Sequence, residues 1–161
     1  MASFEVKGPY PVKLVDGKNG TKFISDDQRE LSNNCTSFRR RGCYIFARGN
    51  VPIYVGKTDA QTIIKKAFDP ANKKKIDRWL VQQKKKTLVI FTVTQIGKGK
   101  TSAKAIDEIE SEFIAFARSR NKELVNKKKM AEPKWSIAGL VRAQQGKPSK
   151  PARALRSALG M

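Results

Sequence analysis

The stretch GCYIFARGNVPIYVGKT, residues 42–58, contains two short apolar segments that each carry a tyrosine. Both segments, 42–46 and 53–57, are rich in the β-branched and aromatic residues typical of strands. The turn-rich sequence ARGNVP joins them, and its length is typical of a β-hairpin connection. The stretch therefore predicts two antiparallel strands joined as a hairpin, each with a tyrosine, Tyr44 and Tyr54.

Basic residues dominate the charge of the 161-residue chain. It has 34 Lys and Arg against 14 Asp and Glu, which gives a formal net charge of +20. Triple-basic runs occur at 39–41, 73–75, 84–86 and 127–129. Such a charge favours a polyanionic partner, and nucleic acid is the first candidate. A generic basic or ribosome-associated protein is the alternative.

The composition also excludes several classes of site. Histidine is absent, so there is no His general base, Ser-His-Asp triad or histidine metal ligand. Two cysteines are too few for a zinc cluster or a disulfide framework. The N-terminal residues lack the apolar segment of a signal peptide, and no apolar run has the length of a membrane span. We therefore expect a cytoplasmic protein with reduced thiols, associated with the nucleoid if it binds DNA.

The remaining pattern predicts an α+β fold. A strand at 4–14 and a return strand at 21–24 flank the turn sequence DGKNG, and a short helix follows toward residue 31. Helices are predicted after Thr58 or Asp59 to residue 68, at 75–83 and at 103–120. The β-branched run at 88–93 predicts a buried central strand.

Three segments follow from this reading. Residues 1–38 form an accessory hairpin and short helix, and residues 39–130 form the main domain. Residues 131–161 are predicted to be a flexible basic tail, because the segment after 140 carries five basic residues and no acidic one.

Glu110 stands out within the predicted helix at 103–120. Apolar residues at 106, 109, 113, 114 and 117 form one helical stripe, and Glu110 falls on it. A carboxylate on a core-facing stripe is costly unless it is paired, binds a cation or faces a cleft. Glu108 and Glu112 lie off the stripe and are expected to face solvent. Glu110 either reaches water along the flank of the helix or faces a cleft, and the tyrosine strands favour the cleft.

These segments resemble, in order, the motifs of the GIY-YIG endonuclease-like superfamily. Cys43-Tyr44-Ile45 resembles its first signature and residues 54–58 its second. Residues 109–114 resemble its glutamate helix, and Leu124-Val125-Asn126 resembles its asparagine motif. The N-terminal hairpin and the sequence KKKMAEPKW, residues 127–135, are similar to a divergent prokaryotic subgroup.

The resemblance implies a small mixed central sheet of about three strands flanked by helices, and phosphodiester hydrolysis with a divalent metal. It makes Tyr44 the general base or the group that orients water, and Tyr54 a phosphate contact. Glu110 would bind Mg²⁺ or Mn²⁺, which polarises the phosphate. Asn126 would help to shape the site, and Tyr44, Tyr54 and Glu110 would share one cleft.

The chain departs from the family at one functional position. The family carries an arginine on the helix after the second signature, and no arginine lies between Lys57 and Lys75. Lys65 or Lys66 is the nearest substitute. Lys66 is preferred because it follows Ile63 by three residues, as the family's arginine follows an aliphatic residue. Lysine supplies a point charge without the bidentate fork of arginine.

Three functions follow as alternatives. The first is a divergent metal-dependent endonuclease acting on DNA. The second is a catalytically weak or inactive domain of the same kind that binds nucleic acid, and the third is a basic RNA- or ribosome-associated protein. DNA is favoured over RNA, and neither a membrane nor a small-molecule cofactor is expected. The predicted phosphate contacts are Lys57, Lys65, Lys73, Lys74, Lys75, Lys127, Lys128 and Lys129.

Overall fold

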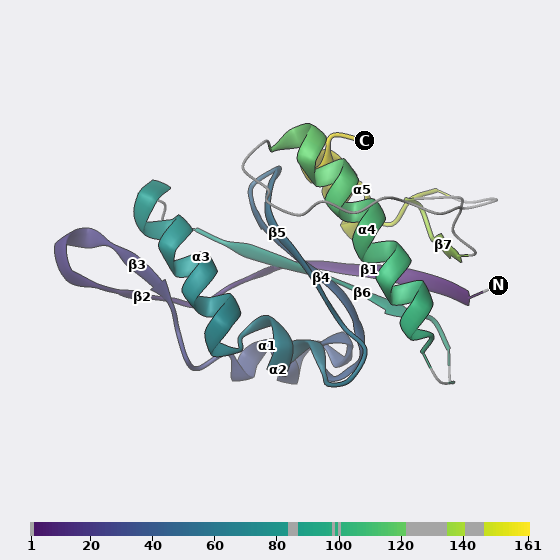
Figure 1. Cartoon of the computed structure of the whole chain (residues 1–161), viewed down its shortest axis with the longest axis horizontal. Helices are drawn as coiled ribbons and strands as arrows, with labels where there is room; N and C mark the ends of the chain where they lie inside the picture. The colour runs from purple at the N-terminus through teal and green to yellow at the C-terminus, as the bar shows by residue number, and fades with distance from the viewer. Residues whose placement is uncertain (1, 84–86, 98, 100, 122–134, 141–146) are drawn as a thin grey trace.

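A computed structural model describes residues 2–83, 87–97, 99, 101–121, 135–140 and 147–161 (Figure 1). The strands are β1 (Ala2–Pro11), β2 (Leu14–Asp16), β3 (Lys22–Ile24), β4 (Gly42–Arg48), β5 (Val51–Thr58), β6 (Val89–Gln95) and β7 (Trp135–Ile137). The α-helices are α1 (Arg29–Asn34), α2 (Ile63–Ala67), α3 (Pro70–Gln83), α4 (Ala103–Arg120) and α5 (Lys150–Leu159). Two short 3-10 helices are η1 (Lys18–Gly20) and η2 (Thr36–Arg39).

The main sheet confirms the predicted α+β class. Its strand order is β5-β4-β6-β1-β7, with antiparallel pairing except between β1 and β7. Strands β2 and β3 form a separate two-stranded sheet. The tyrosine strands form the predicted hairpin, in which Tyr44 lies opposite Gly56 and Phe46 opposite Tyr54. Residues 90–94 of β6 are buried, as expected for a central strand.

Two apolar cores lie on the two faces of this sheet. One contains Cys43 and Ile45 of β4 with Ile106 of α4 and Leu155 of α5. The other contains Tyr44 of β4 and side chains from helices that include α2 and α3. Alternation along β4 therefore sends adjacent residues to opposite layers. Figure 1 shows α4 and α5 on one side of the sheet and α2 and α3 on the other.

The N-terminal strand is not an accessory element, which corrects the sequence reading. Strand β1 lies between β6 and β7, so the sheet has five strands in place of about three. Phe4 and Val6 point into the same core as Ile45. Gly8-Pro9 does not end the strand, because the pairing shifts register between Lys7 and Tyr10 and then continues. Only β2 and β3 form the expected hairpin around the DGKNG turn.

The prediction of a flexible C-terminal tail is wrong for two parts of it. Trp135–Ile137 form β7, which pairs with β1, and Ile137 is fully buried. Lys150–Leu159 form α5, which Ser149 caps by accepting a hydrogen bond on its hydroxyl from the Ala152 amide at 3.2 Å. Ala152, Leu155, Ala158 and Leu159 are fully buried. The apolar residues recur at helical spacing and pack on the sheet, while the basic residues face outward. Residues 131–134 and 141–146 of the expected tail lie outside the described residues.

The helices after the hairpin also differ from their predicted bounds. Helix α2 spans only Ile63–Ala67, and α3 begins at Pro70 although a start at residue 75 was expected. Asp69 caps α3, because its Oδ1 accepts a hydrogen bond from the Asn72 amide at 2.8 Å. Proline is favoured in the first turn of a helix, so Asp69-Pro70 ends one helix and starts the next. No helix in the described part of the chain is long and apolar enough to cross a membrane.

Candidate functional site

Tyr44 and Tyr54 lie side by side on the sheet face that α2 and α3 cover. Their ring centroids are 6.2 Å apart and the rings are tilted by 48°. Gly56 makes this arrangement possible, since a Cβ at that position would lie 2.4 Å from Cζ of Tyr44 and 2.5 Å from its hydroxyl oxygen. The glycine of the second tyrosine segment is thus needed to admit the ring of the first.

Tyr44 is fully buried, with 0% of its surface exposed. Asn72 of α3 donates a hydrogen bond from Nδ2 to the Tyr44 hydroxyl at 2.8 Å, and another to the Lys66 carbonyl at 2.6 Å. Burial, followed by the charge of Tyr54, raises the pKa of Tyr44 far above its ordinary value. A buried hydroxyl with so high a pKa stays protonated near neutral pH, so the phenolate that would act as a general base is not populated. Tyr44 therefore holds α3 against the sheet.

Lys66 and Asp69 form an ion pair at the junction of α2 and α3. The distance from Lys66 Nζ to Asp69 Oδ2 is 2.9 Å. Burial alone would raise the pKa of Asp69, but hydrogen bonds from Lys66 and from the Asn72 amide hold it below its ordinary value. The same hydrogen bond with Asp69 raises the pKa of Lys66. Lys66 stays charged and its side chain is 39% exposed, so it can meet a ligand.

Tyr54 is the partly exposed member of the tyrosine pair. The Lys75 ammonium of α3 lies 5.4 Å from the centroid of its ring, within cation–π range. Burial raises the pKa of Tyr54, the charge of Glu110 raises it further, and the charge of Lys66 lowers it. The Tyr54 side chain therefore lies in the fields of a carboxylate and an ammonium group.

Glu110 belongs to α4, in the layer on the other face of the sheet. Helix α4 packs against β5, which forms one edge of the sheet, and α2 also contacts β5. Glu110 is half-buried, and its charge acts on both Cys43 and Tyr54. Among the predicted residues, Tyr44, Tyr54 and Lys66 thus lie on one face of the sheet, whereas Glu110 belongs to α4 on the other face. That Glu110 shares one cleft with the tyrosines stays a prediction.

The expectation that Glu112 faces solvent is wrong. Its exposed fraction is 4%, and the neighbouring Ser111 is also buried. Helix α5 packs along α4, so the buried face of α4 is wider than the predicted stripe. The sequence reading assigned α5 no place in the core and therefore underestimated this burial.

The predicted lysines fall into two groups. Lys57 pairs with Asp107 at 2.5 Å, and Lys73 pairs with Asp26. Lys65, Lys74 and Lys75 are exposed. Asn126 and the predicted contacts Lys127, Lys128 and Lys129 lie outside the described residues.

The donor set can be compared with the Mg²⁺ that the family resemblance implies. The described residues contain no group of three or more acidic, cysteine or histidine side chains able to hold a metal. Mg²⁺ usually takes one or two carboxylates and completes its shell with water and phosphate. Glu110 as a single half-buried carboxylate fits that mode, provided that a phosphate supplies further oxygens.

Asn72 and Asp69 are the functional residues that sequence reasoning missed as parts of the site. One predicted helix ends at residue 68 and the next begins at residue 75, although Asp69 followed by Pro70 is a helix-start signal. Taking Pro70 as the first helical residue places Asn72 in the first turn of α3, facing the sheet. The pairing of Asn72 with Tyr44 is a long-range contact that local spacing does not reveal.

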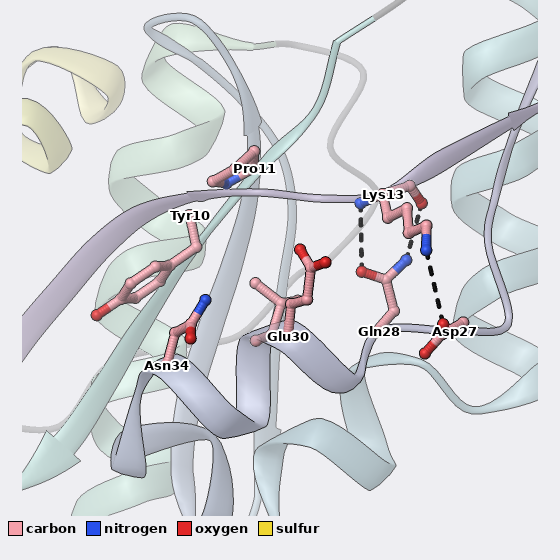
Figure 2. A pocket seen from close by; sticks show the side chains of 8 residues that line it. Tyr10, Pro11, Lys13, Asp27, Gln28, Glu30 and Asn34 are labelled. Carbon is pink, nitrogen blue, oxygen red and sulfur yellow. Dashed lines mark hydrogen bonds and ion pairs between the residues drawn. The ribbon is translucent and has the colours of Figure 1, made fainter.

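A hollow of about 80 Å³ lies between the end of β1 and α1 (Figure 2). Gln28 bridges its wall, donating to the Lys13 carbonyl at 2.8 Å and accepting from the Lys13 amide at 3.2 Å. Lys13 also pairs with Asp27 at 3.6 Å. Ligand pockets typically measure about 300–1,000 Å³. This hollow is therefore too small for a typical ligand, and the polar groups of Lys13, Asp27 and Gln28 are already paired with one another.

Comparisons of the chain with protein-family models, with curated proteins and with solved structures find no match. The resemblance to the GIY-YIG superfamily stays a prediction from the residues, and the geometry above carries the functional argument.

The depressed pKa of Asp69 predicts a pH-dependent contribution to stability. Its folded pKa lies below the unfolded value of about 3.9, so the contribution is present above that pH and is lost as the pH falls through the folded pKa. Asp69→Asn keeps a capping side chain and removes the charge. We expect it to lower the free energy of unfolding by about 0.5–1 kcal/mol at pH 7. Urea denaturation should show this difference vanishing at strongly acidic pH, and a pH-independent difference would contradict the assignment.

Proposed function

We propose that this chain is a divergent GIY-YIG-like domain that binds nucleic acid, with a phosphate held beside Tyr54 and Lys66. The observation that carries the proposal is the position of Tyr54, whose ring lies between the sheet and Lys75 and whose hydroxyl responds to the charge of Lys66. An ammonium group and a phenolic hydroxyl on one partly exposed surface are suited to phosphate oxygens.

The surface around Tyr54 continues the same chemistry along α3. Trp79 lies one turn after Lys75, and the Arg48 guanidinium is 5.8 Å from the centroid of a Trp79 ring. Residues four apart share one helix face, so Lys75 and Trp79 of α3 lie on the same side, where Lys75 contacts Tyr54 of β5 and Trp79 contacts Arg48 of β4. Together with the net charge of +20, this favours binding to the nucleic-acid backbone over a neutral ligand.

Two features favour binding over cleavage as the main function. Tyr44, the predicted general base, is fully buried and has a strongly raised pKa. Lys66, the substitute for the missing arginine, already donates to Asp69 at 2.9 Å. An ammonium group has three donors, so Lys66 can still bind a phosphate while paired. It cannot grip two phosphate oxygens with the planar fork of arginine.

Binding should be strongly salt-dependent and should depend on this surface. If about six phosphates are contacted, the log–log plot of affinity against salt has a slope of roughly −5 on duplex DNA. Lys66→Ala and Lys75→Ala should each weaken binding and reduce the slope by about 1. Lys104→Ala removes the same charge from the exposed start of α4, on the other face of the sheet, and serves as the matched control. A slope near zero, or an equal loss in the control, would contradict the proposal.

Metal-dependent cleavage of DNA is the second candidate, and the position of Glu110 favours it. The charge of this carboxylate raises the pKa of Tyr54, although α4 packs on the other face of the sheet. A Mg²⁺ held by Glu110 would polarise a phosphate at Tyr54. Lys66 would then meet the charge that develops on that phosphate, and Tyr54 would orient it. Tyr44 would hold α3 in place through its buried hydrogen bond with Asn72, without contact with the substrate.

A nicking assay on supercoiled, linear and branched DNA with Mg²⁺ or Mn²⁺ tests this candidate. If the protein cleaves, Glu110→Ala and Lys66→Ala should lower the rate by about 10²-fold or more, because each removes transition-state stabilisation. Lys66→Arg should retain or raise it, since guanidinium binds phosphate bidentately. Tyr54→Phe should cost more activity than Tyr44→Phe, and the reverse order would return Tyr44 to the chemistry. If the wild-type protein cleaves nothing under either metal, binding alone remains as its function.

A further inference from the structure

A hollow of about 450 Å³ lies between the β2–β3 hairpin and the start of α3. Figure 1 shows this hairpin alongside α3, far from α4 and α5. Phe23, Phe68 and Pro70 supply the apolar part of the lining. Its charged part comes from Asp26 and from three side chains in the first two turns of α3, Lys73, Lys74 and Asp77. The volume is within the range of about 300–1,000 Å³ typical of ligand pockets.

Both aromatic rings of the lining are held in place by their surroundings and are partly exposed. Phe23 packs over the turn of the hairpin, where a Cβ on Gly17 would lie 2.1 Å from a carbon of its ring. Phe68 packs edge-on against Phe46 of β4, with ring centroids 5.6 Å apart and an angle of 89°. Fixed aromatic faces that remain accessible lose little conformational entropy when another ring stacks on them.

Most of the charged side chains inside the hollow are paired, whereas its rim carries an exposed lysine. Lys73 forms an ion pair with Asp26, and Asp77 Oδ1 accepts a hydrogen bond from the Ile24 amide at 2.7 Å. These two contacts fasten the hairpin to α3. The exposed Lys74 supplies a positive rim. The interior therefore suits a neutral planar group, whereas the rim suits a phosphate.

The hollow is also adjacent to the candidate site along the chain. Phe68 and Pro70 flank Asp69, whose carboxylate binds Lys66 at 2.9 Å. The lining of the hollow and the Lys66–Asp69 pair are thus joined through the same short segment between α2 and α3. A nucleotide offers the matching arrangement, because its base is neutral and planar and its phosphate is anionic.

We infer that this hollow binds an unpaired nucleobase of single-stranded nucleic acid, with the adjoining phosphates at Lys66 and Lys74. The inference rests on the proposed function and narrows its substrate to nucleic acid with an unpaired segment. In a duplex the bases are stacked and paired, so they cannot enter the hollow without unpairing. Stacking on aromatic side chains does not depend strongly on base identity, so we expect little sequence preference.

Fluorescence anisotropy on the full chain tests the inference with a single-stranded oligonucleotide and a duplex of the same sequence. Phe23→Ala should weaken binding to the single strand by about tenfold, the effect of losing one stacked base. It should change duplex binding by less than about twofold. Phe23→Trp, which keeps an aromatic ring at this position, should retain single-strand binding. Val81→Ala, an exposed apolar truncation elsewhere on α3, should change neither. An RNA strand of the same sequence shows whether the sugar matters.

A second readout reports stacking directly. 2-Aminopurine placed in the single strand should lose fluorescence when the wild-type protein binds, and much less with Phe23→Ala. Lys74→Ala should weaken both the single strand and the duplex, since it removes a phosphate contact. Equal losses with Phe23→Ala on single strand and duplex, or no loss at all, would overturn the base-binding role while leaving nucleic-acid binding intact. If the wild-type protein binds neither oligonucleotide, the proposed function fails and this inference fails with it.

Discussion

The buried hydroxyl of Tyr44 is the constraint on which the site depends. A hydroxyl removed from water needs a hydrogen-bond partner, and Asn72 provides it at 2.8 Å. The Asn72 side chain also donates a hydrogen bond to the Lys66 carbonyl, and its backbone amide donates one to the Asp69 carboxylate. One short network therefore fixes the end of α2 and the start of α3 against β4. Because Asp69 also binds Lys66, the network that stabilises the fold positions the cation of the site.

The two tyrosines occupy different environments in this arrangement. Gly56 leaves room for the ring of Tyr44, which lies beneath the surface and organises α3. Tyr54 lies on the edge strand β5, partly exposed, beside Lys75 and within the fields of Lys66 and Glu110. Under the proposed function a ligand would meet Tyr54 and the lysines, while Tyr44 would act through their placement. The paired tyrosines of the sequence are adjacent in space but differ in exposure, and exposure decides their roles.

Elements defined by local pattern could be predicted from the sequence, whereas those defined by distant contacts could not. The tyrosine hairpin, the buried strand β6 and the long helix α4 follow from alternation, β-branched composition and helical spacing. The place of β1 in the sheet depends on pairing with β6, whose residues are between 78 (Pro11 with Val89) and 91 (Phe4 with Gln95) positions away in sequence. The burial of α5 and Glu112 depends on packing between layers. Tyr44, Tyr54 and Glu110 could be named from the sequence, but Asn72 is recognisable only once Pro70 is known to begin a helix.

A double-mutant cycle on stability tests most directly whether Tyr44 acts by holding Asn72. The free energy of unfolding would be measured by urea denaturation for the wild type, Tyr44→Phe, Asn72→Ala and the double variant. If the hydrogen bond organises the site, the two changes should be non-additive, with a coupling energy of roughly 1 kcal/mol. Additive effects within about 0.3 kcal/mol would contradict the account, because Tyr44 and Asn72 would then stabilise the fold independently.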